Sequence, residues 1–170
     1  MNEFAVLFRR LSVGVYVIGV TDGERRSAFT AAWVTQVSFD PLLLVMSVNP
    51  QNASYAILGA GGAFTVNVLK GGQLELARRF GTSSTREQDK LAGVPWHPAG
   101  NGAPVLDDAL AYFECEPRDI LPAGDHELLV GLVVAGRVID PDAAPMLYAE
   151  TGDMDGSSAL FRAVRPRSDY

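Results

Sequence analysis

Residues 13–30 read Val-Gly-Val-Tyr-Val-Ile-Gly-Val-Thr-Asp-Gly-Glu-Arg-Arg-Ser-Ala-Phe-Thr, and this stretch decides the fold. Its first eight residues are rich in β-branched side chains and predict a strand. Asp22-Gly23 is a hairpin-turn signal, and a second strand is expected around residues 26–30. A turn this short joins antiparallel strands, because parallel strands need a crossover of about a dozen residues or more.

The rest of the chain repeats this pattern of closely spaced strands. Residues 42–48 form a continuous apolar run between Pro41 and Pro50, which is typical of a strand buried on both faces. Most gaps between expected strands are too short for a crossover helix. We therefore expect a mainly antiparallel β-barrel with helices at its edges, and a parallel doubly wound sheet is the weaker interpretation. Further strands are expected at residues 63–69, 111–116 and 127–138, a long polar connection at 82–107, and short helices at 2–11, 52–58 and 73–80.

Length and charge limit the class of protein. The chain has 170 residues, enough for one hydrophobic core, and we interpret residues 1–170 as a single domain. Fourteen Lys and Arg against twenty Asp and Glu give a net charge of −6, which disfavours a nucleic-acid partner. No apolar run approaches the ~18 residues of a membrane-spanning helix, so no membrane partner is expected. The apolar run after Arg9 and Arg10 ends in a hairpin turn rather than a cleavage site, which favours a cytoplasmic location.

Cysteine and histidine are too few for metal or thiol chemistry. Cys115, His97 and His126 lie far apart in the sequence, so no metal site is expected. Acidic residues flank Cys115 and oppose a thiolate, so we expect a core side chain there. A single cysteine forms no internal disulfide, which suits a reducing compartment.

Three separated segments carry a resemblance to a known family. Residues 27–41 read Ser-Ala-Phe-Thr-Ala-Ala-Trp-Val-Thr-Gln-Val-Ser-Phe-Asp-Pro, Gly124-Asp125-His126 opens the long apolar strand, and residues 145–148 read Pro-Met-Leu-Tyr. Residues 76–81, Leu-Ala-Arg-Arg-Phe-Gly, are a supporting match. Together these segments resemble the flavin reductase family, the reductase components of two-component flavin-dependent monooxygenases. The resemblance covers nearly the whole chain and implies an FMN-binding split barrel, a Greek-key-like antiparallel barrel with a few short peripheral helices.

The resemblance also implies where a flavin would bind. Small side chains at the end of a strand let backbone groups approach the edge of a flat ring. A helix N-terminus with hydroxyl donors is a natural phosphate site, and a nearby arginine adds a charge-assisted contact. The flavin ring is expected against Thr30, Ala31, Ala32, Trp33 and Val34, and its binding surface continues with Ser47, Val48 and Asn49. The phosphate is expected at Asn52, Ser54 and Tyr55, with Arg78 or Arg79, beside Phe80, completing the site.

The remaining site residues concern the nicotinamide. By resemblance, His126 lies near the flavin and the nicotinamide and positions the latter, and Tyr148 stacks on the ring or forms a hydrogen bond near it. Two features depart from the family pattern. An acidic run, Ala149-Glu150-Thr151-Gly152-Asp153, stands where the family often has glycine and arginine, and Trp33 is bulky where many relatives have a small polar residue.

These observations favour an NAD(P)H:flavin oxidoreductase that supplies reduced flavin to a monooxygenase partner. The sequence does not choose between FMN and FAD, or between NADH and NADPH. A homodimer is expected, because residues 128–135 are apolar at nearly every position and the resemblance implies a dimer. The alternatives are a non-catalytic flavin-binding electron carrier or storage protein, a pyridoxamine-phosphate oxidase-like enzyme, against which Gly124-Asp125-His126 argues, and more distantly a haem-binding module with His126 as axial ligand.

Overall fold

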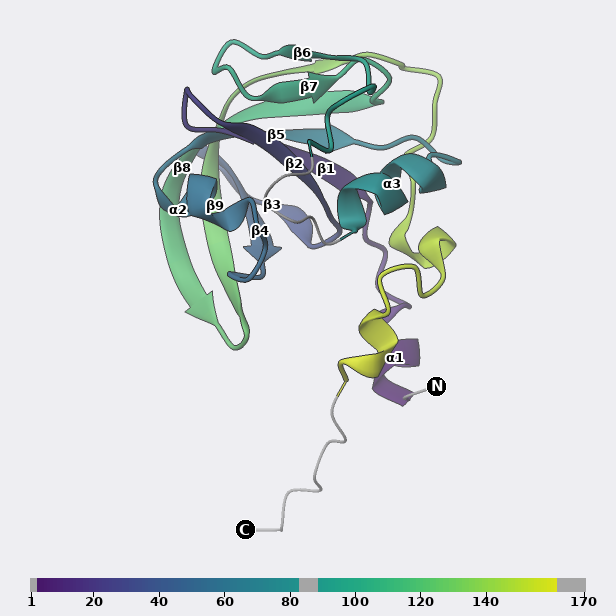
Figure 1. The fold of residues 1–170 in the computed structure, drawn as a ribbon. Helices are drawn as coiled ribbons and strands as arrows, with labels where there is room; N and C mark the ends of the chain where they lie inside the picture. The colour runs from purple at the N-terminus through teal and green to yellow at the C-terminus, as the bar shows by residue number, and fades with distance from the viewer. Residues whose placement is uncertain (1–2, 83–88, 162–170) are drawn as a thin grey trace.

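Seven strands form one antiparallel sheet in the computed structural model, which describes residues 3–82 and 89–161 (Figure 1). Every neighbouring pair of strands in this sheet is antiparallel, which confirms the antiparallel prediction. The order across the sheet is β2 (Arg26–Ala31), β1 (Tyr16–Thr21), β5 (Ala63–Val68), β8 (Ala111–Ala123), β9 (His126–Val138), β4 (Leu42–Val48) and β3 (Val34–Phe39).

The two edges of this sheet are close together along the chain. β2 ends at Ala31 and β3 begins at Val34, so only Ala32 and Trp33 separate the two edge strands. Three Cα–Cα steps span at most about 11 Å, and the sheet must therefore curl until its edges approach. Within the described residues no ladder joins β2 to β3. The mainly β, flavin reductase-like fold is as predicted, but the curled sheet does not close into a barrel.

Two of the three helices are shorter than predicted, and α3 has its predicted length with a shift of one residue. α1 spans Glu3–Phe8, α2 spans Tyr55–Gly59 and α3 spans Leu74–Gly81, with 3-10 turns at Tyr148–Thr151 and Ser157–Ala159. α2 does not begin at Asn52, because the Asn52 side-chain oxygen accepts a hydrogen bond from the Ser54 N–H at 2.9 Å. Such a local side-chain bond competes with helix formation. None of the helices in the described part of the chain is long and apolar enough to cross a membrane.

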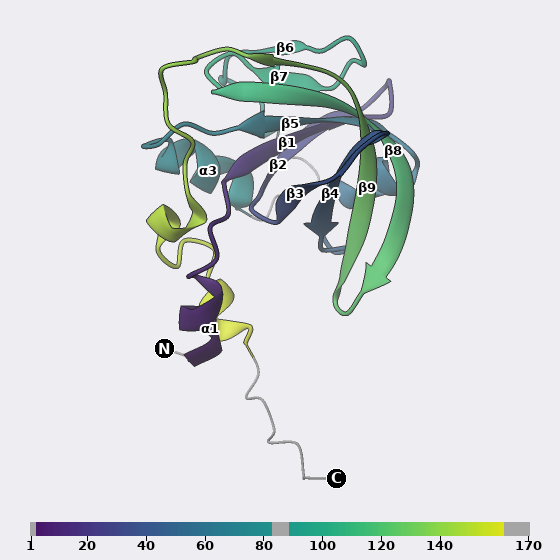
Figure 2. The same ribbon diagram turned by 180° about the vertical axis from the view of Figure 1, so that it is seen from behind.

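One strand is longer than predicted, and the expected connection contains a hairpin that was not predicted. β8 continues past Glu116 to Ala123, and together with β9 it forms a long hairpin that extends from the sheet (Figure 2). Pro117 lies at a register shift in this hairpin, which explains why a strand tolerates it. The connection 82–107 contains a small hairpin of β6 (Trp96–Pro98) and β7 (Pro104–Leu106), held to the sheet by the Leu106 N–H, which donates to the Asn67 side-chain oxygen.

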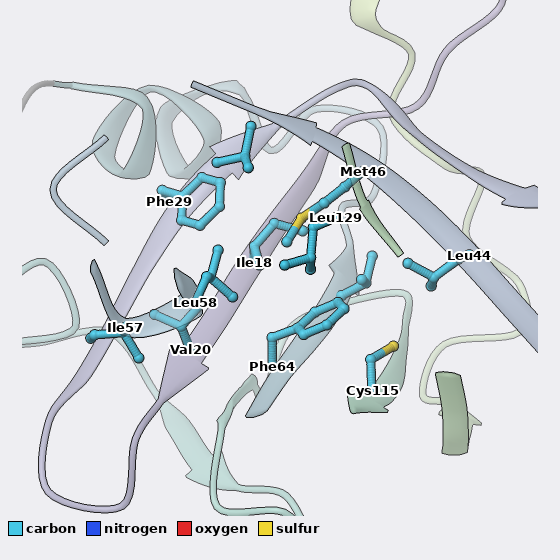
Figure 3. Packing of buried hydrophobic residues seen from close by; sticks show 12 residues of the cluster. Ile18, Val20, Phe29, Leu44, Met46, Ile57, Leu58, Phe64, Cys115 and Leu129 are labelled. Atoms are coloured by element: carbon cyan, nitrogen blue, oxygen red, sulfur yellow. The ribbon is translucent and has the colours of Figure 1, made fainter. Parts of the chain in front are cut away.

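The main core fills the concave side of the curled sheet. Phe64, Met46 and Leu129 come from three different strands and are fully buried together (Figure 3). Cys115 is buried in the same cluster, and desolvation followed by the nearby Glu114 charge raises the pKa of its thiol to about 12. The thiol therefore stays protonated at neutral pH, and the predicted core role of Cys115 is confirmed.

Gly19 in β1 lies where β7 crosses the sheet. A Cβ at this position would collide with the Pro104 carbonyl oxygen and lie 2.7 Å from Thr65 Oγ1. We expect Gly19→Ala to destabilise the protein by about 1–3 kcal/mol, because the backbone must shift to admit the methyl group. Thermal unfolding of this variant measures the effect. Gly71→Ala is the control, since its Cβ would meet its nearest neighbour, the Ala144 oxygen, at 3.7 Å. Equal melting temperatures for the two variants would contradict the prediction.

The outer half of β9 is not covered by this chain. Val134 is 47% exposed, and Val138, four residues further along the strand, is 58% exposed. Other exposed apolar side chains lie on β3, β4 and β8, with Phe39 at 89%. Leu42, Phe113, Val134 and Val138 line one surface depression across β4, β8 and β9, and we call these four residues the exposed sheet patch.

Candidate functional site

An apolar cavity of about 260 Å³ lies between the α1 region, the segment ending at Phe161 and the tip of the β8–β9 hairpin. α1 and the 3-10 turn Ser157–Ala159 lie side by side, away from the sheet (Figures 1 and 2). The Phe8 and Phe161 rings are 5.5 Å apart, and Arg9 Nη2 is 2.8 Å from Asp153 Oδ1. The lining residues are Ala5, Phe8, Arg9, Leu11, Val13, Trp33, Asp125, His126, Tyr148, Ser157, Leu160 and Phe161.

Most polar groups of this cavity already have protein partners. The Tyr148 hydroxyl donates to Asp155 at 2.8 Å and lies 2.9 Å from the Ser157 hydroxyl, and burial raises its pKa. Tyr148 thus lines the cavity, while its hydroxyl is held by the segment behind it. Arg9 is neutralised by Asp153. The apolar cavity therefore suits a flat, uncharged ring.

His126 is held on two sides at the edge of the apolar cavity. It follows the turn at Gly124, whose φ of +72° favours glycine, and it opens β9. Its Nδ1 lies 2.9 Å from Asp125 Oδ1, and its ring centroid lies 5.1 Å from that of Trp33 at an interplanar angle of 54°. The imidazole projects at the mouth of the curled sheet and not into the core.

A second, polar cavity of about 170 Å³ lies beside the C-terminal end of α3. Lys90 Nζ donates to the Phe80 carbonyl oxygen at 3.0 Å and to the Thr82 carbonyl oxygen. No carboxylate is among the described lining residues, and burial lowers the pKa of Lys90. The ammonium thus caps carbonyl oxygens at the C-terminal end of α3, and with three N–H donors it can still donate one charge-assisted hydrogen bond to an anion. The lining residues are Phe29, Thr30, Gln51, Asn52, Ala53, Phe80, Gly81, Thr82 and Lys90.

Several residues predicted for the phosphate have other partners. Ser54 Oγ lies 2.8 Å from Ser27 Oγ, and the Tyr55 hydroxyl donates to Glu127. Neither residue lines the polar cavity, and the five-residue α2 is too short to act as an anion site. Of the residues predicted near the phosphate, Asn52 and Phe80 line the polar cavity, together with Thr30, which was predicted for the ring.

The two predicted arginines are also engaged elsewhere. Arg78 forms an exposed pair with Glu75, its Nη1 lying 2.7 Å from Oε1. Arg79 donates through Nε to the Lys90 carbonyl oxygen at 2.9 Å and through Nη2 to the Ala92 carbonyl oxygen. Arg79 therefore fixes the segment that carries Lys90, and the cation of the polar cavity is the lysine.

Residues 30–33 link the two cavities. Thr30 lines the polar cavity and Trp33 the apolar one, and three Cα–Cα steps of at most about 11 Å separate them. Thr30 Oγ1 donates to the Ala77 carbonyl oxygen at 2.6 Å, and the Ser47 N–H donates to the Trp33 carbonyl oxygen at 2.9 Å. The other predicted ring residues line neither cavity and lie in or beside strands β2, β3 and β4: Ala31, Ala32, Val34, Ser47, Val48 and Asn49.

Sequence reasoning missed Lys90, Gln51, Phe8, Leu11 and Asp125 as lining residues. Asp125 was adjacent to a predicted site residue, and its position before His126 was the available signal. Phe8 and Leu11 follow an amphipathic helical pattern that suggests core packing. For Lys90 no local signal exists, because only the fold brings it to the polar cavity.

Comparison with known proteins identifies the family. The model of the flavin reductase like domain matches residues 8–157. The chain is 36% identical over 130 residues to diflavin flavoprotein A 1 of Synechocystis sp., covering 76% of this chain and 23% of that protein. It is 35% identical over 141 residues to the high molecular weight rubredoxin of Moorella thermoacetica, covering 82% of this chain and 61% of that protein. The chain spans about a quarter of the length of the diflavin relatives.

Solved structures give the same result. The NADH:FAD oxidoreductase SgcE6 of Streptomyces globisporus matches with a TM-score of 0.80 and 29% identity, over 88% of this chain and 89% of that chain. Nitrilotriacetate monooxygenase component B of Mycobacterium thermoresistibile matches with a TM-score of 0.76 and 29% identity, over 85% and 79%. These TM-scores show that the neighbours share the overall fold of this chain. The chain belongs to the flavin reductase-like family.

Proposed function

We propose that the protein is an NAD(P)H:flavin oxidoreductase that binds FMN or FAD across the two cavities. The observation that carries this proposal is the placement of residues 30–33, which join an apolar cavity with an aromatic wall to a polar cavity with a lysine whose partners among the described residues are carbonyl oxygens. A flavin nucleotide has the same arrangement, a flat ring at one end and a phosphate at the other.

In this arrangement the phosphate lies by Lys90, Asn52 and Thr82, and the ring lies along residues 30–33 toward Trp33. The Ser47 bond to the Trp33 carbonyl fixes the backbone beside the ring. The acidic total charge of the chain does not oppose binding, because the lining of the polar cavity contains no described carboxylate.

The nicotinamide is a substrate in this proposal. A bound flavin supplies a two-electron acceptor for hydride, so the chain's residues act by positioning and by excluding water. His126 lies where a nicotinamide stacked near the ring would meet it, and Phe8, Leu11 and Leu160 supply apolar walls. The titles of the neighbours support this assignment, since SgcE6 is an NADH:FAD oxidoreductase and was solved with NAD and FAD fragments.

The test is a binding and reduction experiment on the purified chain. FMN and FAD are titrated separately while flavin and tryptophan fluorescence are recorded, and NADH or NADPH is then added without oxygen. Saturable binding followed by loss of the visible flavin absorbance supports the proposal. Absence of binding of either flavin at high micromolar concentration would reject it.

A homodimer accounts for the exposed sheet patch. Monomeric proteins rarely expose large contiguous apolar surfaces, and the patch spans β4, β8 and β9. Light scattering is expected to give twice the 18.2 kDa chain mass. Val134→Glu is expected to shift the protein to the monomer mass, because it places a charge in the interface. Ala60→Glu, exposed after α2, is the control and keeps the dimer. A wild-type monomer at working concentration would contradict the proposal.

The fate of the reduced flavin has two candidate answers. Release to a monooxygenase partner is favoured by the likeness to a monooxygenase component B. Transfer of electrons from a retained flavin to a second redox protein is favoured by relatives named diflavin flavoprotein and rubredoxin, of which this chain covers only part. The ratio of free to bound flavin after reduction distinguishes them. Release predicts that a size-exclusion step under anaerobic conditions strips the reduced flavin, and retention predicts that the flavin elutes with the protein.

A further inference from the structure

The hydrogen bond between Asp125 and His126 has a chemical consequence for the apolar cavity. Asp125 Oδ1 lies 2.9 Å from His126 Nδ1. A carboxylate only accepts hydrogen bonds, so the neutral imidazole must carry its proton on Nδ1 to form this contact. Nε2 then has a lone pair and acts as an acceptor. Within the described residues Nε2 has no protein partner.

The surroundings hold this geometry in place. The His126 side chain is 19% exposed, while Asp125 is 93% exposed on the solvent side. The Trp33 ring, 5.1 Å away, restricts rotation of the imidazole. Asp125 belongs to the hairpin turn that follows β8, so the backbone places the carboxylate next to the histidine. Asp125 therefore borders the apolar cavity and also contacts the His126 ring directly.

The geometry points to Asp125 as a positioning residue that fixes His126 in the Nδ1-protonated form. In this form Nε2 accepts a hydrogen bond from an N–H group of the ligand. This inference rests on the proposed function, in which the ligand is a nicotinamide. Nicotinamide combines a flat ring with a carboxamide, and the carboxamide N–H is then the donor that Nε2 recognises. The other polar groups that line the cavity support this choice, since Arg9 and Tyr148 are already bonded to Asp153 and Asp155.

The protonation state can be measured directly, without flavin or activity. The chain has two histidines, so ¹⁵N-labelled protein gives two imidazoles. His97 has a similar bond, its Nδ1 lying 2.6 Å from Asp107 Oδ1, and serves as internal reference. At a pH where both rings are neutral, His126 is expected to be protonated on Nδ1. Asp125→Ala is expected to move the proton mainly to Nε2, and Asp125→Asn, whose amide oxygen still accepts, to retain the original form.

The control for this measurement is Asp107→Ala, which is expected to change the His97 signals and leave those of His126. Wild-type His126 protonated on Nε2, or an unchanged His126 in Asp125→Ala, would overturn the inference. Melting curves of each variant show whether the fold is retained, and a folded Asp125→Asn provides the comparison even where Asp125→Ala unfolds.

The recognised group is tested with a nucleotide that lacks the N–H donor. Reduced 3-acetylpyridine adenine dinucleotide replaces the carboxamide by a methyl ketone. The wild type is expected to prefer NADH in kcat/KM by roughly tenfold, the effect of one hydrogen bond, and Asp125→Ala to lose most of this preference. Equal use of both nucleotides by the wild type would overturn the assignment of the carboxamide. If neither nucleotide reduces the flavin, the proposed function fails, and the ¹⁵N experiment still decides the role of Asp125.

Discussion

Lys90→Met is expected to weaken FMN binding by about 30- to 100-fold while riboflavin binding stays unchanged. A charge-assisted contact to a phosphate contributes about 2–3 kcal/mol. Riboflavin has no phosphate, so its binding does not depend on this contact. The physical basis is the polar cavity, in which Lys90 has carbonyl partners and no described carboxylate. Methionine keeps most of the length of the side chain and removes the charge.

Titration of both flavins against the variant measures this effect. Arg78→Met is the control, because Arg78 is exposed and paired with Glu75 outside the cavity. Lys90 also holds the Phe80 carbonyl, so the melting temperature of the variant must be recorded. An equal loss for FMN and riboflavin would indicate a structural role, and unchanged FMN affinity would remove Lys90 from the site.

The same lysine predicts a pH dependence. Burial lowers the pKa of Lys90 from its ordinary value, so the ammonium is lost at a lower pH than in an exposed lysine. Phosphate binding needs the charged form. FMN affinity is therefore expected to fall as the pH rises through this lowered pKa, while riboflavin affinity does not follow. Parallel pH curves for the two flavins would contradict this prediction.

His126→Ala is expected to slow flavin reduction by about 10- to 100-fold, or about 1.4–2.7 kcal/mol of transition-state stabilisation. Flavin affinity should stay nearly intact, because His126 lines the apolar cavity and not the polar one. The loss follows from the nicotinamide being less well oriented toward the ring.

Anaerobic stopped-flow measurements on flavin-saturated protein, with NADH varied, give the rate of reduction. His97→Ala is the matched control: His97 also pairs with an aspartate, but it lies on β6 and lines neither cavity. An unchanged rate and NADH dependence for His126→Ala would remove the residue from the site. A lower melting temperature with normal turnover per loaded site would assign it a structural role.

The parts of the fold that local chemistry determines could be predicted from the sequence. The Asp22-Gly23 turn defines the β1–β2 hairpin, and the apolar run between two prolines defines β4. The far half of β8 could not be predicted, because Pro117, Arg118 and Asp119 have the composition of a loop. They remain in a strand because β9 pairs with them through register shifts, a long-range effect.

The site shows the same division between local and long-range information. Trp33, Thr30 and His126 belong to compact sequence motifs, and each lines one of the two cavities. Arg78 and Arg79 were expected at the phosphate by resemblance, and neither lines the polar cavity. The structure instead uses Arg79 to hold the backbone at Lys90, eleven residues later. This contact depends on the path of the polar connection after α3, and the hydrophobic periodicity of the sequence does not predict that path.

The contact between Trp33 and His126 also provides an optical probe. The chain has two tryptophans, and the second, Trp96, lies on β6 with the Arg26 guanidinium 6.0 Å from its ring centroid, outside both cavities. A Trp96→Phe variant would therefore have a single emitter, placed on the wall of the apolar cavity beside an imidazole. Its emission would report occupancy of that cavity by a colourless ligand, in real time and without turnover.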